Sequence, residues 1–425
     1  MKIGYLQIGS SEHGVCRYGN LLAREAQKRK NLNVTEVNIT LKRDWKHNRA
    51  ILTDAAKQLS AADVVHFQYS LGNNKNLWGQ SWLKLYSLWV FVSHCSSPLV
   101  VTLHDIYPLP SFSTEAFNFI NRWFQPTVST TTEKNAVASS VASTLKKIKL
   151  SNPISKLFAT LRRISGANLE AFTLRWLLSR VELVFVCSEV EAQRLKAIVN
   201  NNKTRIVPIY VEERSITIDR QKARELLRLD KNQKIITLLG FIHPRKGHQL
   251  IVEAMSKLPA DVIAIFAGST SPDPYSQAYL EQLFRLAKAS GVECRLRVTG
   301  YLSEEELELY LLATDLAVCP FQNLSASASL STWISVARPI LAFDLPQIAE
   351  YNKLEPGAIK TFSPYTSDAL VDAIANFLNA NHDEIEPAVD RLRTKLSVTT
   401  IFDRLLTYYD NFAKKYELLE LSTNL

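Results

Sequence analysis

Short apolar runs alternate with amphipathic segments along most of this chain. In the first half the apolar runs lie at 2–9, 33–40, 63–69, 99–103, 183–187 and 205–209, and segments such as 18–29 between them show helical spacing. Strands that are apolar along their whole length are buried on both faces, which is typical of parallel sheets joined by crossover helices. The pattern therefore predicts an α/β fold with a doubly wound parallel sheet.

The alternation restarts after a polar, charged stretch near 212–232, which we interpret as a domain boundary. Beyond it, strands are predicted at 234–240, 261–268, 294–298, 316–320 and 339–343, and helices at 278–290, 303–312, 330–336, 368–378 and 401–416. We expect one Rossmann-like domain at 1–212, a second at 213–400, and a helix at 401–425 that returns toward the first domain. Ligands of such sheets bind at the carboxyl ends of the strands, so an interdomain cleft is the expected site.

Composition and charge narrow the class of protein. The chain has 425 residues, 46% of them apolar and 21% charged, which suits a globular protein with two large cores. The first residues read directly as a strand, no apolar run is long enough to span a membrane, and the five cysteines show no paired spacing. We therefore expect a cytoplasmic protein without disulfides or a zinc site. The net charge of +9 permits an anionic partner without selecting one.

An insertion at about 113–180 separates the fourth and fifth predicted strands. Its first part, at 127–144, is rich in Ser, Thr and Ala, whereas 146–180 interleaves apolar residues with many basic ones and a single acidic residue, Glu170. Such a basic amphipathic surface is suited to peripheral contact with an anionic membrane, here the inner face. The alternative is a solvated helix face that packs on its own domain. Nucleic acid is not an expected partner.

The stretch 236–254 carries the clearest candidate chemistry. An apolar strand ends at Gly240, a short loop brings Arg245 and Lys246, and Gly247 leads into an amphipathic helix. A helix start offers unpaired N–H groups and a partial positive charge, and two neighbouring cations add to both. The stretch is either a phosphate site or a loop with solvated basic residues.

Four segments in order resemble the GT-B glycosyltransferases, specifically the retaining group numbered family 4 (group 1). They are Gly-Phe-Ile-His-Pro-Arg-Lys-Gly at 240–247, Val-Thr-Gly-Tyr-Leu-Ser-Glu-Glu-Glu-Leu at 298–307, Ala-Thr-Asp-Leu-Ala-Val-Cys-Pro at 313–320 and Ala-Arg-Pro-Ile-Leu-Ala at 337–342. The resemblance implies a GT-B fold, with the first domain on the acceptor side and the second binding a nucleotide sugar. Val-Thr-Leu-His-Asp at 101–105 is similar to the family segment whose histidine faces the donor sugar.

The resemblance also assigns roles to residues. Arg245 and Lys246 would stabilise the leaving diphosphate, and His104 would act near the reacting carbon, with Asp105 as its orienting or capping partner. The donor-binding set would be Gly14, Gly240, Tyr301, Leu302, Ser327, Ser329, Leu330 and Thr332. Arg17 and Tyr18 belong to a pattern in which the arginine either meets an anionic acceptor group or caps a helix.

One departure from the family concerns a pair of glutamates, one for the donor sugar and one for the ribose. Counting back from Pro339, their positions fall on Leu324 and Thr332, and the segment 325–332 consists mainly of small residues. Serine hydroxyls and the N–H groups of the helix start near Leu330 would have to supply the missing contacts.

The implied function is that of a retaining hexosyltransferase. It would move a sugar from a nucleotide diphosphate sugar to a glycan or lipid-linked acceptor, by front-face attack, with no metal and no cofactor besides the co-substrate. The absence of the paired glutamates leaves a second reading open, a non-catalytic GT-B subunit that binds a partner in glycan assembly. A sugar-nucleotide epimerase is the third, although it would need more carboxylates than the motifs show.

Overall fold

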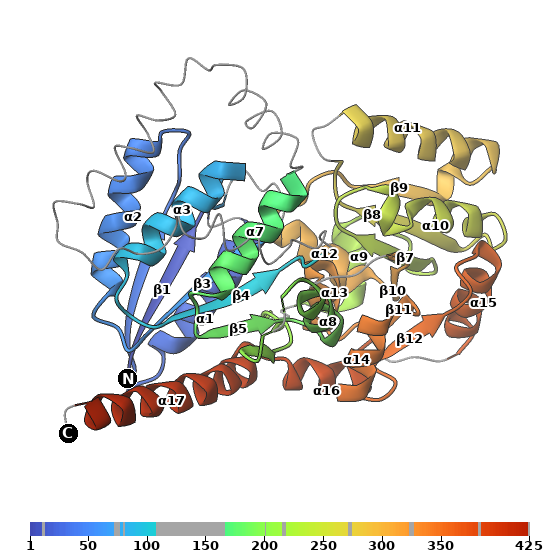
Figure 1. Ribbon diagram of the computed structural model, residues 1–425. Coiled ribbons are helices and arrows are strands. Elements are labelled where there is room, and N and C mark those ends of the chain that lie inside the picture. The colour runs from blue at the N-terminus through green and yellow to red at the C-terminus, as the bar shows by residue number, and fades with distance from the viewer. Residues whose placement is uncertain are drawn as a thin grey trace, which may run out of the picture. The chain divides into compact units, whose positions relative to one another are not determined.

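The computed structural model describes residues 1–10, 13–71, 77–79, 81–107, 166–199, 201–214, 218–270, 274–322, 327–380 and 384–423. These residues form two compact units, coloured along the chain in Figure 1. The first unit comprises Met1–Val186, Glu191–Ile206 and Tyr408–Leu425, and the second comprises Cys187–Val190 and Val207–Thr407.

A parallel sheet forms the centre of the first unit. Among the described residues it has six strands in the order β2-β1-β3-β4-β5-β6. Their bounds are β1 Lys2–Ile8, β2 Asn33–Ile39, β3 Val64–Ser70, β4 Leu99–His104, β5 Leu183–Val186 and β6 Thr204–Ile206. The chain runs outward from β1 to β2 and then in the opposite direction from β3, so the order reverses between β1 and β3. Such a reversal opens a crevice at the carboxyl ends of the two strands.

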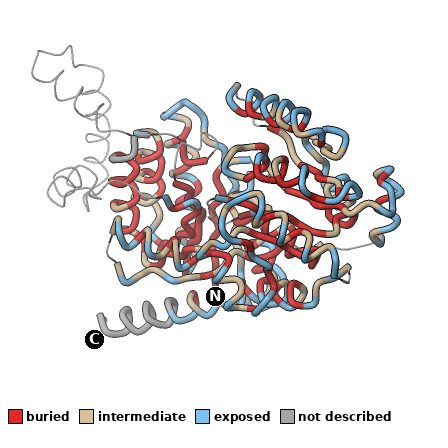
Figure 2. Tube along the Cα trace, turned by 90° about the vertical axis from the view of Figure 1, so that its right-hand side faces the viewer, coloured by how far each residue is buried: buried red, intermediate tan, exposed pale blue. Residues whose placement is uncertain are grey.

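The helices of the first unit follow their strands in the predicted alternation. They are α1 Gly14–Gln27, α2 Trp45–Leu59, α3 Ser81–His94, α7 Gly166–Leu178 and α8 Glu189–Ile198, whose first two residues belong to the second unit. Strands β3, β4 and β5 are buried along their whole length, as the apolar runs predicted. Figure 2 shows the same distribution, with buried residues along the strands and exposed residues on the outer sides of helices.

The second unit repeats this architecture. Its sheet, in the part of the chain that the structure covers, also has six parallel strands, in the order β12-β11-β10-β7-β8-β9. Their bounds are β7 Lys234–Leu239, β8 Val262–Ala267, β9 Leu296–Val298, β10 Leu316–Cys319, β11 Ile340–Phe343 and β12 Ile359–Phe362. The order reverses between β7 and β10, and in sheets of this kind ligands bind at the carboxyl ends of the strands beside such a reversal.

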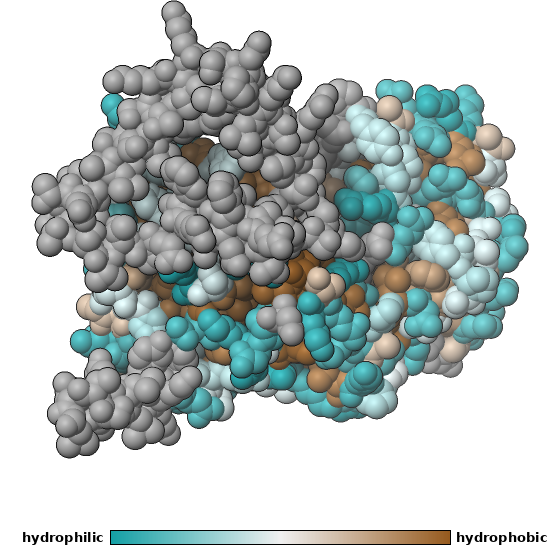
Figure 3. All heavy atoms as spheres, viewed as in Figure 1, coloured by the Kyte–Doolittle hydropathy of each residue, from teal (hydrophilic) through white to brown (hydrophobic). Residues whose placement is uncertain are grey.

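The α-helices of the second unit complete the alternation. They are α9 Arg220–Leu226, α10 His248–Met255, α11 Pro274–Ala289, α12 Glu304–Ala313, α13 Ala328–Ser335, α14 Pro346–Leu354, α15 Ser367–Leu378, α16 Pro387–Lys395 and the first part of α17 Val398–Thr423. Ser303 and Glu306 form a capping box at α12. The surface of this unit in the right-hand part of Figure 3 is largely hydrophilic, with small apolar patches. The predicted α/β fold with two doubly wound sheets is confirmed.

Several bounds differ from those we expected. The main segment of the second unit begins at Val207 rather than 213, and α17 starts at Val398 and passes into the first unit at Tyr408. Strand β12 was not predicted because its pattern, Ile-Lys-Thr-Phe, buries only the two ends. The stretch 294–298 begins as a 3-10 turn, so only Leu296–Val298 form a strand. Apart from the additional strand β12, these differences shift only the ends of elements.

The end of the basic insertion is part of the first unit's core. Residues 108–165, which include 127–144 and most of 146–180, lie outside the described residues. The remainder forms α7, whose Phe172, Leu174 and Trp176 are buried. Its Glu170 accepts hydrogen bonds from Lys84 Nζ at 2.7 Å and from the Tyr69 hydroxyl at 2.6 Å. For α7 the interpretation as a helix that packs on its own domain is therefore the correct one.

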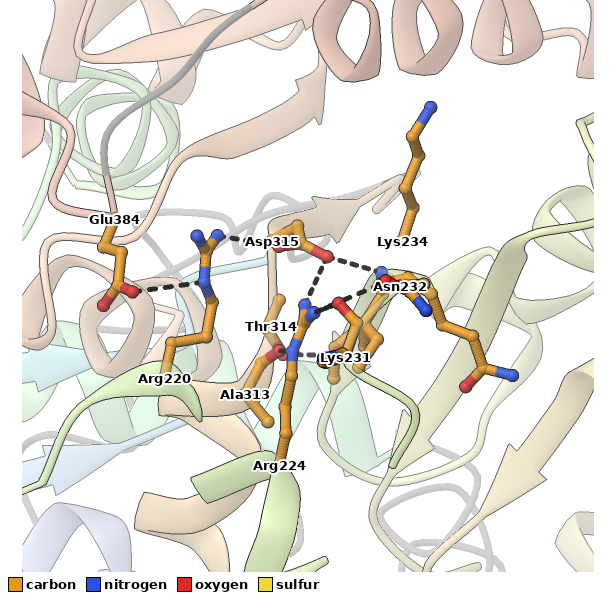
Figure 4. Close-up of polar contacts among 12 residues, drawn as sticks. Arg220, Arg224, Lys231, Asn232, Lys234, Ala313, Thr314, Asp315 and Glu384 are labelled. Atoms are coloured by element: carbon orange, nitrogen blue, oxygen red, sulfur yellow. Dashed lines mark hydrogen bonds and ion pairs between the residues drawn. The ribbon is translucent and has the colours of Figure 1, made fainter. Parts of the chain in front are cut away.

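An ion-pair network fixes the edge of the second sheet that is opposite the carboxyl ends (Figure 4). Asp315, just before β10, pairs with Arg224 Nη2 at 2.6 Å and with Arg220 Nη1 at 2.8 Å, and it accepts the backbone N–H of Ile235 at 2.7 Å. Arg220 also pairs with Glu384 at 3.3 Å. The network joins α9 to β7 and β10 at the amino ends of these strands. Their carboxyl ends therefore remain available for ligand binding.

All five cysteines are free thiols. Within the described ranges, no helix combines the length and the apolar content needed to cross a bilayer.

Candidate functional site

The loop after β7 is held in a conformation that requires glycine. Gly240 has φ 118° and Gly247 has φ 82°, both in the left-handed region. A Cβ on Gly247 would lie 2.4 Å from the carbonyl oxygen of Pro320, which follows β10. Between the two glycines, Pro244–Lys246 form a 3-10 turn capped by His243, whose Nδ1 accepts the N–H of Arg245 at 3.2 Å. The loop is therefore packed tightly against the end of β10, at the reversal point of the sheet.

Lys246 lies at the centre of this packing. Its Nζ donates a hydrogen bond to Ser329 Oγ at 3.0 Å and lies 4.2 Å from the centroid of the Phe321 ring. Burial lowers the pKa of Lys246 from its usual value, while Cys319 acts in the opposite direction. No ion pair between Lys246 and a carboxylate is present among the described residues. A half-buried ammonium without a carboxylate partner favours the binding of an anion.

Arg245 and Lys246 do not share one environment. Arg245 is exposed, and its backbone carbonyl accepts the N–H of Gln322 at 3.1 Å. The main chain of Arg245 thus joins the two loops, whereas its side chain lies at the surface. Of the two cations predicted from the sequence, Lys246 is the one that the packing holds in place.

The second loop of this site leads from β10 into α13. Ser327 is the N-cap of α13, and its Oγ accepts the N–H of Leu330 at 3.3 Å. Thr332 donates its hydroxyl to the carbonyl of Ala328 at 2.9 Å, one turn earlier. The Leu330 N–H and the Thr332 hydroxyl, both predicted to bind the donor, are therefore engaged within the helix. The first-turn N–H groups of Ala328 and Ser329 and the Ser329 hydroxyl remain as the donors that α13 can offer a ligand. Residues 323–326, which include Leu324, lie outside the described residues.

A third loop follows β9 on the other side of β7. The N–H of Gly268, after β8, donates to Thr299 Oγ1 at 3.1 Å, and Gly300 has φ 78°. Tyr301 comes next with 85% of its side-chain surface exposed, while Leu302 packs against the apolar cluster between α9 and α12. The predicted base-binding pair thus presents one free aromatic ring and one anchored residue.

His104 ends β4 in the first unit and is almost fully buried. Its Nε2 lies 2.9 Å from Gln68 Oε1, and its ring meets the ring of Tyr18 edge-on at 5.0 Å between centroids. Burial lowers the pKa of His104 to about 4, partly opposed by the charge of Asp105. The imidazole is therefore neutral at pH 7, so it can accept a hydrogen bond at one nitrogen and donate one at the other.

Asp105 adopts a strained backbone next to this histidine. Its φ is 58°, in the left-handed region that a non-glycine residue seldom occupies, and its Oδ2 accepts a hydrogen bond from Ser70 Oγ at 3.3 Å. The strain turns the chain sharply after β4. The role of Asp105 as the orienting or capping partner of His104 stays a prediction.

Helix α1 brings the remaining predicted residues of the first unit together. His13 is its N-cap, with Nδ1 accepting the N–H of Val15 at 3.3 Å, and burial lowers the pKa of this histidine. Gly14 opens the helix at an exposed position, and no atom lies within 4 Å of a Cβ built on it. Arg17 is half-buried one turn later, and Tyr18 is buried against His104. Glu12, which precedes the N-cap His13 in the sequence, lies outside the described residues.

Three features of the site were not predicted from the sequence. They are the contact between Gln68 and His104, the contact of Lys246 with the Phe321 ring, and the capping of α1 by His13. A signal for Gln68 was present. His66, Gln68 and Ser70 alternate with apolar residues in a strand that is otherwise fully buried, and buried polar side chains need partners. A search of the described part of the chain finds no group of His, Cys, Asp and Glu side chains that could hold a metal ion.

Comparison with solved structures identifies the fold. HepE of Anabaena, solved in complex with UDP, superposes with a TM-score of 0.65 at 14% identity over 97% of this chain and 100% of that one. Sucrose-phosphate synthase of Thermosynechococcus elongatus gives a TM-score of 0.63 at 15% identity over 97% and 98% of the two chains. The chain therefore has the GT-B fold of these glycosyltransferase structures.

Comparison with protein families adds a narrower assignment. Residues 219–392 match the family described as glycosyl transferases group 1. The D-inositol 3-phosphate glycosyltransferase of Mycolicibacterium smegmatis is 31% identical over 143 residues, and that of Mycobacterium tuberculosis is 29% identical over 102 residues. The matches cover 32% and 24% of this chain and 32% and 21% of the relatives, at most about a third of their length. Over residues 219–392 the chain is therefore similar to glycosyl transferases group 1.

Proposed function

We propose that the protein is a glycosyltransferase that moves a sugar from a nucleotide diphosphate sugar to an acceptor hydroxyl. The observation that carries this proposal is the environment of Lys246. Its ammonium is half-buried at the reversal point of the second sheet, bonded to a serine and next to the start of α13. A diphosphate is the ligand that these donors suit best.

The proposed reaction breaks the bond between the anomeric carbon and the diphosphate oxygen. Negative charge then develops on the leaving diphosphate, where Lys246 and the first-turn N–H groups of Ala328 and Ser329 stabilise it without a protein-bound metal. The acceptor oxygen forms the new bond on the same face of the sugar, and its proton passes to the leaving phosphate. This front-face route retains the anomeric configuration, and we propose a hexose as the transferred sugar.

His104 is proposed to contact the donor sugar. Because it is neutral at pH 7, one imidazole nitrogen is free to accept a hydrogen bond from a sugar hydroxyl. Tyr301, with its exposed ring, and the main chain of Leu302 are proposed to contact the nucleobase. Gly240 belongs to the same donor set because its lack of a side chain leaves room beside Lys246 Nζ, which lies 3.3 Å from the position of a Cβ.

The acceptor is proposed to be a glycan or a lipid-linked molecule in polysaccharide or glycoconjugate synthesis. The mycobacterial relatives are named for D-inositol 3-phosphate, which is an anionic acceptor. Arg17 on α1 is the residue that we propose to meet such an anionic group, with Tyr18 beside it. We also propose a cytoplasmic location with peripheral contact to the inner face of the membrane through 146–165.

A thermal-shift series tests the donor site. Saturating UDP, GDP and ADP and their sugar conjugates should each be compared, and at about 100 times its Kd the correct ligand adds about 2.7 kcal/mol of stability. This corresponds to a rise in the melting temperature of several degrees. The Lys246→Ala variant should lose the rise, whereas Lys257→Ala, a surface lysine on the same unit paired with Asp368, should keep it. Release of nucleotide diphosphate in the presence of acceptor then tests transfer.

A non-catalytic GT-B subunit is the second candidate. It is favoured by Thr332, which stands where the family has an acidic residue and whose hydroxyl is engaged within α13. If no nucleotide or nucleotide sugar shifts the melting temperature, and Lys246→Ala leaves the biological activity intact, the protein is not an enzyme of this class.

A further inference from the structure

A line of buried polar side chains runs behind His104 in the first unit. His104 Nε2 lies 2.9 Å from Gln68 Oε1, and Gln68 Nε2 lies 3.5 Å from His66 Nε2. His66 Nδ1 lies 2.5 Å from the hydroxyl of Tyr409. These four side chains are each at most 6% exposed. The line therefore connects β4, β3 and the C-terminal helix α17 through the interior of the unit.

The line has one consistent direction of proton donation. Gln68 Nε2 belongs to an amide NH2 group, which can only donate, so the contact with His66 Nε2 makes this ring nitrogen an acceptor. The Thr102 hydroxyl, whose Oγ1 lies 2.8 Å from the same nitrogen, can then donate to it as well. A nitrogen that accepts carries no proton, which places the proton of neutral His66 on Nδ1, facing the Tyr409 oxygen. The Gln68 amide then presents its oxygen to His104 and accepts the N–H of Nε2.

The direction of hydrogen-bond donation along these side chains determines which ring nitrogen of His104 is unprotonated. If Nε2 carries the proton, Nδ1 holds the lone pair of the neutral ring. Burial keeps both rings neutral at pH 7, with the pKa of His66 lowered to about 3 and that of His104 to about 4. A neutral histidine in water exchanges between its two tautomers, whereas a partner on one nitrogen selects one of them.

We propose that Gln68, His66 and Tyr409 are positioning residues that hold His104 as the Nε2–H tautomer, so that Nδ1 is the atom that accepts a ligand hydroxyl. The assignment of Nδ1 as the atom that accepts a ligand hydroxyl rests on the proposed function, whereas the assignment of the tautomer does not. Tyr409 lies two residues beyond Thr407, the last residue of the second unit, on the continuous helix α17. The C-terminal helix thereby takes part in setting the state of the candidate catalytic histidine.

The tautomer of His104 is directly measurable by NMR. Protein labelled with ¹⁵N-histidine and examined at pH 7.5 gives long-range ¹H–¹⁵N correlations that distinguish a protonated ring nitrogen from a bare one. The His104→Asn and His66→Asn variants assign the two sets of signals. We expect a protonated Nε2 and a bare Nδ1 for His104, and the opposite pattern for His66.

Variants test whether the line causes this state. Gln68→Leu removes the acceptor and should change the tautomer ratio of His104 at least about fivefold, the effect of one net hydrogen bond. Tyr409→Phe should shift the ratio of His66 in the same way and that of His104 to a smaller extent. Tyr408→Phe, a neighbouring ring that contacts Phe185, is the matched control and should change neither.

Gln68→Glu provides a conservative rescue and a safeguard against misfolding of the leucine variant. A carboxylate still accepts from His104 Nε2 but cannot donate to His66, so His104 should keep its tautomer while His66 changes. The proposal is overturned if His104 in the wild type carries its proton on Nδ1, or if a folded Gln68→Leu variant leaves its signals unchanged. These measurements need no donor or acceptor, so they stand or fall independently of the glycosyltransferase assignment. If transfer is demonstrated, Gln68→Leu should lower kcat and leave the KM for the acceptor within about twofold.

Discussion

Lys246 Nζ and Ser329 Oγ, separated by 83 positions in the sequence, are joined by a hydrogen bond of 3.0 Å. The bond links the loop after β7 to the first turn of α13, and these are the two loops at the reversal point of the second sheet. It orients the ammonium beside the first-turn N–H groups of a helix before any ligand arrives. Preorganised donors of this kind bind an anion without a further cost of reorganisation.

The Ser329→Ala variant should weaken the binding of nucleotide diphosphates about fivefold. The lysine remains, but it loses the neutral partner that fixes its position, and one hydrogen bond contributes about 1 kcal/mol. Lys246→Met removes the charge and should weaken binding at least about ten times more than Ser329→Ala does. The reason is that hydrogen bonds to charged groups contribute more to the binding free energy than neutral ones. Isothermal titration measures both. Equal affinities for the wild type and Ser329→Ala would show that the bond has no role in binding.

The Gly247→Ala variant should destabilise the second unit by about 2 kcal/mol or more. Its left-handed backbone is strained for any side chain, and the new Cβ would lie 2.4 Å from the Pro320 carbonyl oxygen, which is main chain and cannot turn away. Chemical denaturation measures the loss. Gly14→Ala is the control, since this glycine opens α1 in open space, and it should cost nothing or add stability. A neutral Gly247→Ala would mean that the loop can adopt another conformation.

The fold was predictable to the extent that burial leaves a pattern in the sequence. Strands β1, β3, β7 and β8 are buried along most of their length and were placed within a residue or two, whereas β12, with Lys360 and Thr361 exposed, was missed. Local motifs such as the Ser303–Glu306 capping box were equally visible. The burial pattern of a strand involves residues that are neighbours in the sequence, so a single sequence is enough to reveal it.

The candidate site was predictable only in part. Lys246 stood out because a cation follows a strand and precedes a helix. Its partners Ser329 and Phe321 come from a loop far along the chain, and no spacing rule relates them to it. For Leu330 and Thr332 the sequence shows which groups can donate but not that the helix itself already uses the Leu330 N–H and the Thr332 hydroxyl. Their part in donor binding stays a prediction.

Asp315→Asn should destabilise the second unit by about 3 kcal/mol. The carboxylate receives Arg224 and Arg220, and Arg224 is buried, so removing the negative charge leaves a guanidinium without its counter-charge (Figure 4). The controlled comparison is Asp261→Asn, whose pair with Lys234 is long, at 3.6 Å, and exposed, and which should cost less than about 0.5 kcal/mol. Nucleotide affinity should be unchanged in both variants, because Asp315 lies at the opposite edge of the sheet from Lys246. A loss near that of the control would contradict a stabilising role for the network.

Acid should destabilise the second unit through His248. This residue on α10 is fully buried against Phe266, its Nδ1 donates to the His243 carbonyl at 3.3 Å, and burial lowers its pKa to about 3. The unfolded chain binds a proton at this residue below about pH 6.5, and the folded chain does not until about pH 3, so between these values the unfolded state binds more protons. Stability is therefore complete above pH 6.5 and falls as the pH decreases.

The size of this effect follows from the pKa difference. One proton changes the free energy of unfolding by about 1.4 kcal/mol per pH unit, which amounts to about 2 kcal/mol between pH 6.5 and pH 5. His248→Asn keeps a donor for the His243 carbonyl and removes the titrating ring. The variant starts from a lower stability at pH 7, because it leaves space beside Phe266, but it should lose about 2 kcal/mol less than the wild type on acidification. Denaturation midpoints measured at intervals from pH 7.5 to pH 5 give both slopes, and parallel slopes would mean that His248 is protonated in the folded protein as readily as in the unfolded chain.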